Sequence, residues 1–505
     1  MFMYQNQEKI SLQSLIEQIS GRSQGIDCTG LSGADRAYLA CRIYKKLKAP
    51  VIAIVASTKD AEVFLEDLLF FSEKTDTPII YFPPYNILPF KDLAYHSETA
   101  AKRIRTLYRL IVDEVPMIVV TTVDALLHKI IPKQEIINYA ELIEKGEEID
   151  RDLLVKKLLC GGYVQSMIVE EPGDFCVRGG ILDIFSPLYS DPLRIELFGD
   201  TVDSLRFFSA ADQRTTKNIL EAVILPAKEA ILKTEHTDEI ITRIRAQAST
   251  LGISVTKVRE LVNRIKNEGD FPGIDSLIPL LYPKLASFFE YVPEQALYML
   301  IEPPELEKAA QEFQKQTSHN FMSACNKNRL CVEPHKLYLE WTQAKEILEP
   351  QNPLAIRMFS MSTVSLEGRQ PAFQVEFSVK DNTTISLELK RRREKALLSP
   401  LANWINDKKQ SEIAIFLVCH SGLQAQRLKS LLAPYGIQLS LIESFSDADP
   451  GKGLAYVCLG RISSGFVWPS ESVAVITEDE IFGVKHRRPR MTAKKPRTEL
   501  WHLKI

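Results

Sequence analysis

The sequence predicts a multidomain α/β protein in which a parallel-sheet domain carries a small β-rich insert and is followed by a further α/β domain. Continuous apolar runs such as VIAIVA (51–56) and PMIVVTT (116–122) alternate with helical periodicity, which is typical of parallel strands covered on both faces. A compact segment of alternating strands then interrupts this pattern, and apolar strands return after residue 350. The 505 residues also exceed what one core can organise.

The first α/β domain is expected to begin within residues 1–135. Helical periodicity and apolar runs follow one another along the chain, with a glycine-containing stretch, Gly25–Gly33, ahead of the second helix. We expect helices at 12–20, 34–48, 59–71 and 97–112, and strands at 51–56, 78–83 and 116–122.

A β-rich module is expected over residues 136–225, after a charged and mostly helical lead-in. Within Glu170–Thr215, the runs VRGGILDIF and LRIELFG alternate with period two, and SPLYSDP between them has turn chemistry. The segment 226–350 contains helices and one short strand, ALYMLIE, so it lacks a sheet of its own and is expected to pack back onto the first domain. Residues 351–483 predict the further α/β domain, and 484–505 a basic linker or tail.

Composition excludes several classes of protein. The formal net charge of −3 argues against attraction of nucleic acid by the whole surface. No apolar run of about 18 residues and no signal peptide occur, so we expect a cytoplasmic protein without membrane contact. The eight cysteines form no CxxC pair and the histidines are scattered, so no metal site is predicted and the thiols are expected to be free and buried.

The stretch DCTGLSGADRAYLA lies where a nucleotide-binding phosphate loop would stand, ahead of a helix. In the template GxxxxGK[ST], glycine amides hold the phosphates, lysine neutralises them and the hydroxyl binds Mg²⁺. With Gly30 as the first glycine, Gly33 lies inside the loop, and Asp35, Arg36 and Ala37 replace the second glycine, the lysine and the hydroxyl. We therefore expect no nucleotide hydrolysis here, and we interpret VAVITEDE (473–480) as a strand followed by a solvated acidic turn.

Several stretches resemble the amino-terminal region of the bacterial transcription-repair coupling factor. The β-rich module is similar to the UvrA-binding module that this family shares with the excinuclease subunit UvrB, and the resemblance extends to YFPPYNILPFKDLAYHSETAAKRIRTLYRL (81–110), GDFPGIDSLIPLLYPKLASFFEYVP (269–293) and SSGFVWPSESVAVITEDEIFG (463–483). It implies a UvrB-like, RecA-like fold with a degenerate phosphate loop. The family's RNA-polymerase-interacting and translocase domains have no counterpart motif in this sequence.

The resemblance also implies which residues bind UvrA. By motif, the family's two arginines and one phenylalanine fall on Arg178 (CVRGG), Arg194 (PLRIE) and Phe198 (IELFG). Arginine and exposed aromatic residues are frequent interface anchors, and residues four apart on one strand share a face. The alternative is that both arginines only pair with Glu170, Glu171, Glu196 or Asp200 at the surface.

The function that follows is recruitment of UvrA in transcription-coupled nucleotide excision repair, by a UvrB-mimicking module that is not an enzyme. No cofactor is expected, because the family's ATP and Mg²⁺ serve its translocase part; RNA polymerase and DNA are partners of the full-length family protein. Two alternatives stay open, namely a nucleotide-dependent DNA-remodelling, helicase-like protein and a direct binder of damaged DNA. The second would use the KRRREK run (390–395) or the basic tail, although a solvated face and a flexible linker explain both.

Overall fold

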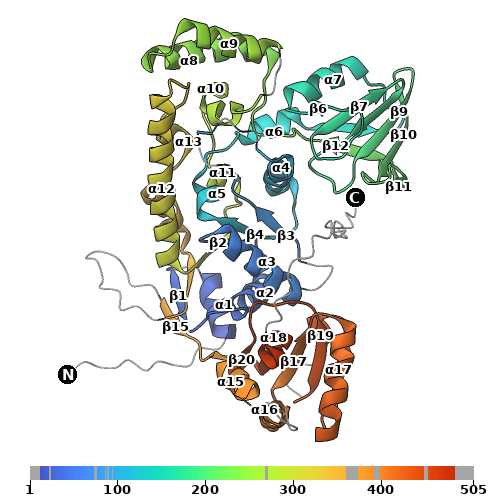
Figure 1. Cartoon of the computed structure of the whole chain (residues 1–505), viewed down its shortest axis with the longest axis vertical. Helices are drawn as coiled ribbons and strands as arrows, with labels where there is room; N and C mark the ends of the chain where they lie inside the picture. Colours follow the sequence, from blue (N-terminus) through green and yellow to red (C-terminus); the bar gives the residue numbers. More distant parts are fainter. Residues whose placement is uncertain are drawn as a thin grey trace, which may run out of the picture.

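The computed structural model describes residues 12–21, 24–72, 77–85, 87, 90–91, 93, 95–267, 271–359, 373–391, 398–448 and 453–483. A central parallel sheet carries the β-rich module beside one end and the last α/β domain at the other (Figure 1). The predicted tail and residues 392–395 of the KRRREK run lie outside the described residues.

The central sheet has seven strands in the order β15-β1-β14-β13-β2-β4-β3, and every neighbouring pair is parallel. Successive residues of its interior strand β2 (Val51–Val55) pack into opposite cores: Ile52 and Ile54 lie on one face, and Val51, Ala53 and Val55 lie on the other. The strands are β1 (Ile26–Thr29), β2 (Val51–Val55), β3 (Ile79–Phe82), β4 (Ile118–Thr122), β13 (Leu297–Ile301), β14 (Leu354–Arg357) and β15 (Phe373–Glu376).

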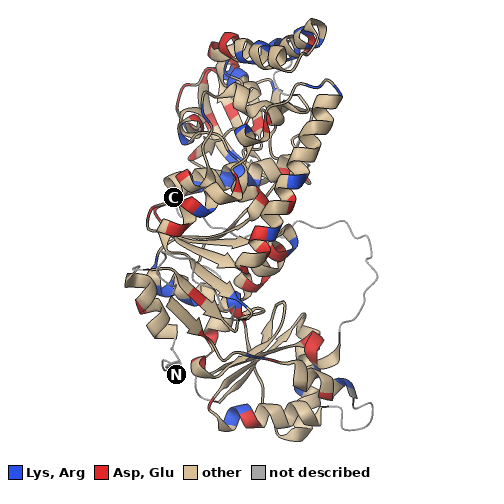
Figure 2. Ribbon diagram, turned by 90° about the vertical axis from the view of Figure 1, so that its left-hand side faces the viewer, with Lys and Arg blue, Asp and Glu red and all other residues tan. Residues whose placement is uncertain are grey.

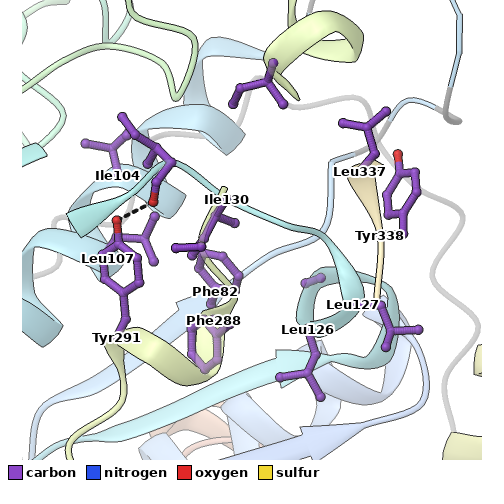
Figure 3. Close-up of a cluster of buried hydrophobic side chains, with 14 of the residues drawn as sticks. Phe82, Ile104, Leu107, Leu126, Leu127, Ile130, Phe288, Tyr291, Leu337 and Tyr338 are labelled. Atoms are coloured by element: carbon purple, nitrogen blue, oxygen red, sulfur yellow. Dashed lines mark hydrogen bonds between the residues drawn. The ribbon is translucent and has the colours of Figure 1, made fainter. Parts of the chain in front are cut away.

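Helices cover both faces of this sheet. The first face carries α1 (Leu12–Gly21), α2 (Asp35–Leu47) and α3 (Thr58–Phe71). The second core lies among α4 (Ser97–Val112), α5 (Val123–Leu127) and the long α12 (Pro303–Asn326), and Figure 3 shows its aromatic and aliphatic side chains meeting. There the Tyr291 hydroxyl donates to the Ile131 carbonyl at 2.6 Å, so this buried phenol is satisfied.

Three strands of the sheet were not anticipated. β1 lies inside Gly25–Gly33, and its Asp27 is paired with Arg357 of β14 at 2.8 Å, so a charged residue is accommodated in a sheet. β14 and β15 lie beyond the expected boundary at residue 350, yet they flank β1 on its two sides. The sheet of the first domain therefore extends to Glu376, because its edge is built from strands far apart in the sequence.

The segment after the module is helical and returns to the central sheet. Its strand β13 lies between β14 and β2. Its remaining helices are α8 (Thr237–Thr250), α9 (Val255–Asn267), α10 (Ile278–Leu281), α11 (Phe288–Tyr291), α13 (Pro334–Leu337) and α14 (Trp341–Leu348).

The β-rich module contains a six-stranded sheet in the order β11-β10-β9-β8-β7-β6 and a separate pair, β12-β5. β5 was not anticipated, because its residues stand in a charged stretch that was interpreted as mostly helical. The elements are α6 (Lys133–Tyr139), β5 (Glu141–Glu144), α7 (Arg151–Cys160), β6 (Val164–Gln165), β7 (Asp174–Arg178), β8 (Ile181–Ile184), β9 (Leu193–Phe198), β10 (Thr201–Phe208), β11 (Thr215–Ile219) and β12 (Glu221–Ile224).

The last α/β domain has a second six-stranded sheet, in the order β16-β20-β21-β17-β19-β18. Aromatic rings join it to the first domain, where Tyr38 of α2 and Phe71 of α3 both contact Phe466 of β20. Its elements are β16 (Lys380–Asp381), α15 (Thr383–Arg391), α16 (Ser399–Gln410), β17 (Ala414–Cys419), α17 (Gly422–Leu432), β18 (Ser440–Ile442), β19 (Ala455–Leu459), β20 (Phe466–Trp468), β21 (Val473–Thr477) and α18 (Glu478–Phe482).

Candidate partner-docking face

The six-stranded sheet of the module has one face on its own core and one that we call the outer face. Alternation in β9 sets this division, because Leu193 and Ile195 are buried in the core while Arg194, Glu196 and Phe198 point the other way. Neighbouring strands continue the outer face with Cys176 and Arg178 of β7, Ile181 and Asp183 of β8, and Ser204, Arg206 and Phe208 of β10.

One buried carboxylate holds both predicted arginines. The antiparallel register places Asp183 directly opposite Arg194, and Asp183 is fully buried. Arg194 donates from Nε and Nη2 to its two oxygens at 2.7 and 2.9 Å, and Arg178 donates from Nη2 at 2.7 Å. Hydrogen bonding to Asp183 raises the pKa of Arg194. The two guanidinium groups are thereby fixed before any partner arrives.

The two arginines differ in what they present. The Arg194 side chain is 16% exposed and lies 4.4 Å above the ring of Phe208, so most of its surface is used internally. The Arg178 side chain is 52% exposed and makes its one described ion pair through a single nitrogen. Arg178 can therefore still offer donors to a partner carboxylate, whereas Arg194 mainly supports Asp183.

Phe198 is 85% exposed, which is unusual for an aromatic side chain. It ends β9 beside the tight turn at Gly199, whose φ of +65° suits glycine. Phe198 therefore stands at the tip of the β9–β10 hairpin, on the face that carries the arginines.

The four acidic partners proposed for simple surface pairing are not the ones the arginines use. Glu196 pairs with Arg206 and accepts from Ser204, and Glu171 accepts from Ser97 of α4 at 2.7 Å. The described chain gives Glu170 and Asp200 no ion pair with either arginine. Both arginines thus pair with Asp183 and not with those four residues. The sequence did not indicate Asp183, because only the pairing of β8 with β9 brings it opposite Arg194.

Helix α4 of the first domain fixes the module in place. Arg105 donates from Nε to the Pro187 carbonyl at 2.7 Å and from Nη2 to the Tyr189 carbonyl at 2.9 Å, so it clamps the SPLYSDP turn. Two residues earlier on α4, Arg103 is wholly buried and donates to Glu229, in the segment that leads out of the module, at 2.7 Å. Two arginines of α4 thus attach the module to the first domain.

The Arg103–Glu229 pair is the centre of a buried polar network. The Tyr85 hydroxyl also donates to Glu229 at 2.7 Å, and the arginine lies 4.3 Å from the Tyr85 ring. Arg103 approaches His128 Nδ1 at 3.3 Å, and burial followed by the arginine charge lowers the His128 pKa to about 3. Despite its burial, the pKa of Glu229 is lowered through the Arg103 charge. We therefore assign a neutral histidine beside an ionised pair.

In the degenerate phosphate loop, the side chain of Asp35 occupies the place where a phosphate would bind. The Asp35 carboxylate accepts from the Ser32 and Gly33 amides at 3.2 and 2.9 Å, so the amides that would hold a phosphate already hold a carboxylate. Arg36 turns away to the Leu31 carbonyl and to Glu302, and Ala37 is buried.

The last α/β domain covers this loop. A Cβ on Gly33 would approach Ser464 Oγ to 2.1 Å, and Ser463 donates from its amide and hydroxyl to Asp67 of α3 at 2.6 and 2.7 Å. Burial raises the pKa of Asp67 to about 7, although both hydrogen bonds oppose the shift. A cavity of about 330 Å³ remains between the loop and α15.

The acidic segment after β21 was expected to be a solvated turn, and this expectation is wrong. It forms α18, with a capping box between Thr477 and Glu480, and Glu478 is buried. Glu480 also accepts from the Gly465 amide at 3.0 Å. These carboxylates therefore face the interior of the domain. The sequence did not reveal this, because turns and helix caps use the same residue types.

Among the described residues, no group of three or more histidine, cysteine or acidic side chains could hold a metal ion. The eight cysteines all lie in the described residues and form no disulfide; five are buried, and Cys41, Cys160 and Cys325 are partly exposed. No helix in the described part of the chain has the length and apolarity to cross a membrane.

Comparison with known proteins agrees with this geometry. Residues 142–229 match the family model of the UvrB interaction domain, and residues 409–481 match that of the MFD D3 domain. The transcription-repair-coupling factor of Myxococcus xanthus is 27% identical and aligns with 94% of this chain. Those of Bacillus subtilis strain 168 and Escherichia coli strain K12 are each 26% identical, over 95% and 92% of the chain. The chain spans about 40% of the length of these relatives.

The chain is therefore a multidomain α/β protein whose β-rich module matches the UvrB interaction domain. The chain is similar to the transcription-repair coupling factors, and the predicted resemblance to their amino-terminal region is confirmed. A solved helicase structure, XPD helicase, aligns with 91% of this chain at 8% identity, but its TM-score of 0.23 carries no argument about the fold.

Proposed function

We propose that this chain recruits UvrA through the outer face of its β-rich module, and that it performs no nucleotide chemistry in doing so. The observation that carries the proposal is the combination of Arg178 and Phe198, both largely exposed, on the domain that matches the UvrB interaction model. Exposed arginine and aromatic side chains are the residue types that most often dominate binding energy.

The physical basis is preorganisation. Asp183 orients Arg178 before binding, so less side-chain entropy is lost when a partner carboxylate replaces water. A bidentate carboxylate on UvrA would suit the free edge of Arg178, and an apolar pocket would suit Phe198. Arg194 contributes mainly by holding the Asp183 carboxylate in position.

The rival function, a nucleotide-dependent remodelling enzyme, is disfavoured by the phosphate loop. The Asp35 carboxylate occupies the amides that a phosphate would need, and it would repel an approaching phosphate. Calorimetry with ATP and Mg²⁺ tests this directly: we expect no heat of binding, and affinity in the micromolar range would contradict the non-catalytic proposal.

Direct binding to damaged DNA is the other alternative. In the view of Figure 2, lysine and arginine are interspersed with acidic residues along the ribbon, and the formal net charge is −3, so neither observation favours DNA binding by the whole surface. We assign the binding of RNA polymerase and DNA, which the resemblance implies for the full-length family protein, to regions other than this chain. A salt titration of duplex binding checks this, because a DNA-binding protein loses affinity steeply as salt rises.

Single substitutions test UvrA recruitment. Arg178→Ala, Arg194→Ala and Phe198→Ala should each weaken binding by about 1–4 kcal/mol, the range of interface anchors. Arg259→Ala and Phe359→Ala are matched controls, because both side chains are exposed and distant in sequence from the module. A triple variant that still captures UvrA like the wild-type chain in a pull-down would refute the proposal.

A further inference from the structure

We infer that Met167 is a second apolar anchor on the outer face and inserts into a hydrophobic pocket of the same partner that receives Phe198 and Arg178. This inference rests on the proposed function, because the occupant is taken to be UvrA. It adds a contact that no motif indicated, on the opposite side of the arginine pair from Phe198.

Met167 reaches the outer face because the chain turns over β7 after the short edge strand β6. The Ser166 amide donates to the Phe175 carbonyl at 2.9 Å, which continues the edge, and Cys176 Sγ then lies 3.4 Å from the Met167 carbonyl. Two residues later, Val169 is fully buried in a small cluster with Cys176 and Phe208 on this face. The backbone of Met167 is therefore anchored on both sides.

The side chain of Met167, by contrast, is exposed to solvent. Met167 is 91% exposed and the adjoining Ile168 is 52% exposed, while Val169 beside them is wholly buried. A singly exposed apolar residue needs no explanation, but the backbone of Met167 is held over Cys176 of the outer face, the face to which Phe198 and both arginines also belong. Apolar anchors beside a charged centre are the arrangement of a protein-binding patch.

Strand pairing gives the spacing of the two anchors. Cys176, Asp183 and Arg194 lie opposite one another on β7, β8 and β9. Two strand spacings separate β7 from β9, and Phe198 lies four residues beyond Arg194, so the backbone sites under the anchors are roughly 16 Å apart. Arg178 lies two residues beyond Cys176 on β7, in the interval between them.

The partner chemistry follows from this layout. A complementary partner surface needs a carboxylate for Arg178 and one apolar pocket on each side of that carboxylate. The distance between the two pockets is small enough for all three sites to lie within one protein–protein interface of standard size. Methionine suits the second pocket because its unbranched, polarisable side chain adapts to irregular apolar surfaces. Because Met167 lies on the same outer face as Arg178 and Phe198, we infer that all three residues contact the same partner and not two different proteins.

Titration calorimetry of the whole chain with purified UvrA tests the inference. Met167→Ala should weaken binding about fivefold to thirtyfold, and Met167→Leu should retain most of the affinity, as expected for a truncated and a refilled apolar anchor. Met322→Ala is the matched control, because Met322 is 63% exposed and lies on α12, outside the module. Circular dichroism should show unchanged folding, since the Met167 side chain is open.

The outcomes separate this inference from the proposed function. If Phe198→Ala weakens binding but Met167→Ala binds like wild type, or if Met322→Ala weakens it equally, the Met167 anchor is overturned and UvrA recruitment stands. If Phe198→Ala and Arg178→Ala also bind like wild type, recruitment through this face fails as a whole. Loss with Met167→Ala and Phe198→Ala, and none with Met322→Ala, supports both.

Discussion

Replacing Asp183 by asparagine tests the internal support of the docking face. The variant keeps the size of the side chain but removes the charge that both arginines share. Charge-assisted hydrogen bonds contribute about 1.5–3 kcal/mol, and the pair with Arg178 counts for less because that side chain is 52% exposed and screened by water. The pair with Arg194, whose side chain is 16% exposed, carries most of the loss.

We therefore expect Asp183→Asn to cost about 2–3 kcal/mol, which speeds amide exchange in β8 and β9 by about 30- to 160-fold where exchange follows local unfolding. Hydrogen exchange is the suitable assay because a chain of several domains does not unfold in one step. Asp203→Asn, an exposed substitution on the neighbouring β10, is the control. Equal exchange in the two variants would refute the assignment of Asp183 as the organising residue.

Three further predictions concern the domains around the module. Glu229→Ala removes the partner of a wholly buried arginine, so it should lower the local free energy of unfolding of α4 by about 3–5 kcal/mol, measured by amide hydrogen exchange, against no more than a small change in the exposed control Glu235→Ala. Asp67 has a folded-state pKa raised to about 7 from 3.8, so its protonated form is the one that folding favours. The stability that it contributes is fully present below about pH 4 and is lost as the pH rises through about 7, and Asp67→Asn should flatten this dependence in a pH series of thermal unfolding. Asp35→Ala should speed exchange of the two loop amides that the carboxylate now accepts from, and unchanged protection would show that the carboxylate does not fill the loop.

The sequence predicted the elements whose signal is local. The helices α3 and α4 and the strands β2, β3 and β4 lie within two residues of their expected limits, because buried apolar runs and helical periodicity are properties of the segment itself. β1 escaped prediction because four residues with a charged member do not resemble a buried strand, and its Asp27 is tolerated only through Arg357, 330 positions away.

The candidate site shows the same limit. Arg178, Arg194 and Phe198 were identified by their motif, and the structure brings them to one face, but their role in binding UvrA stays a prediction. Asp183 was missed because it lies in the apolar run ILDIF and gains its meaning from register with β9. Met167 was missed because exposure of an apolar side chain is a tertiary property that local sequence does not reveal.

The most direct test of the account is the affinity of the chain for UvrA when only the exposed anchors are removed. Arg178→Ala with Phe198→Ala leaves the Asp183–Arg194 pair intact, so a loss of binding cannot come from a collapsed sheet. We predict that calorimetry shows binding for the wild-type chain and for Arg259→Ala with Phe359→Ala, and at least a hundredfold weaker binding for the double variant, or about 2.7 kcal/mol. Equal affinity of the two double variants would contradict the claim that this face recruits UvrA.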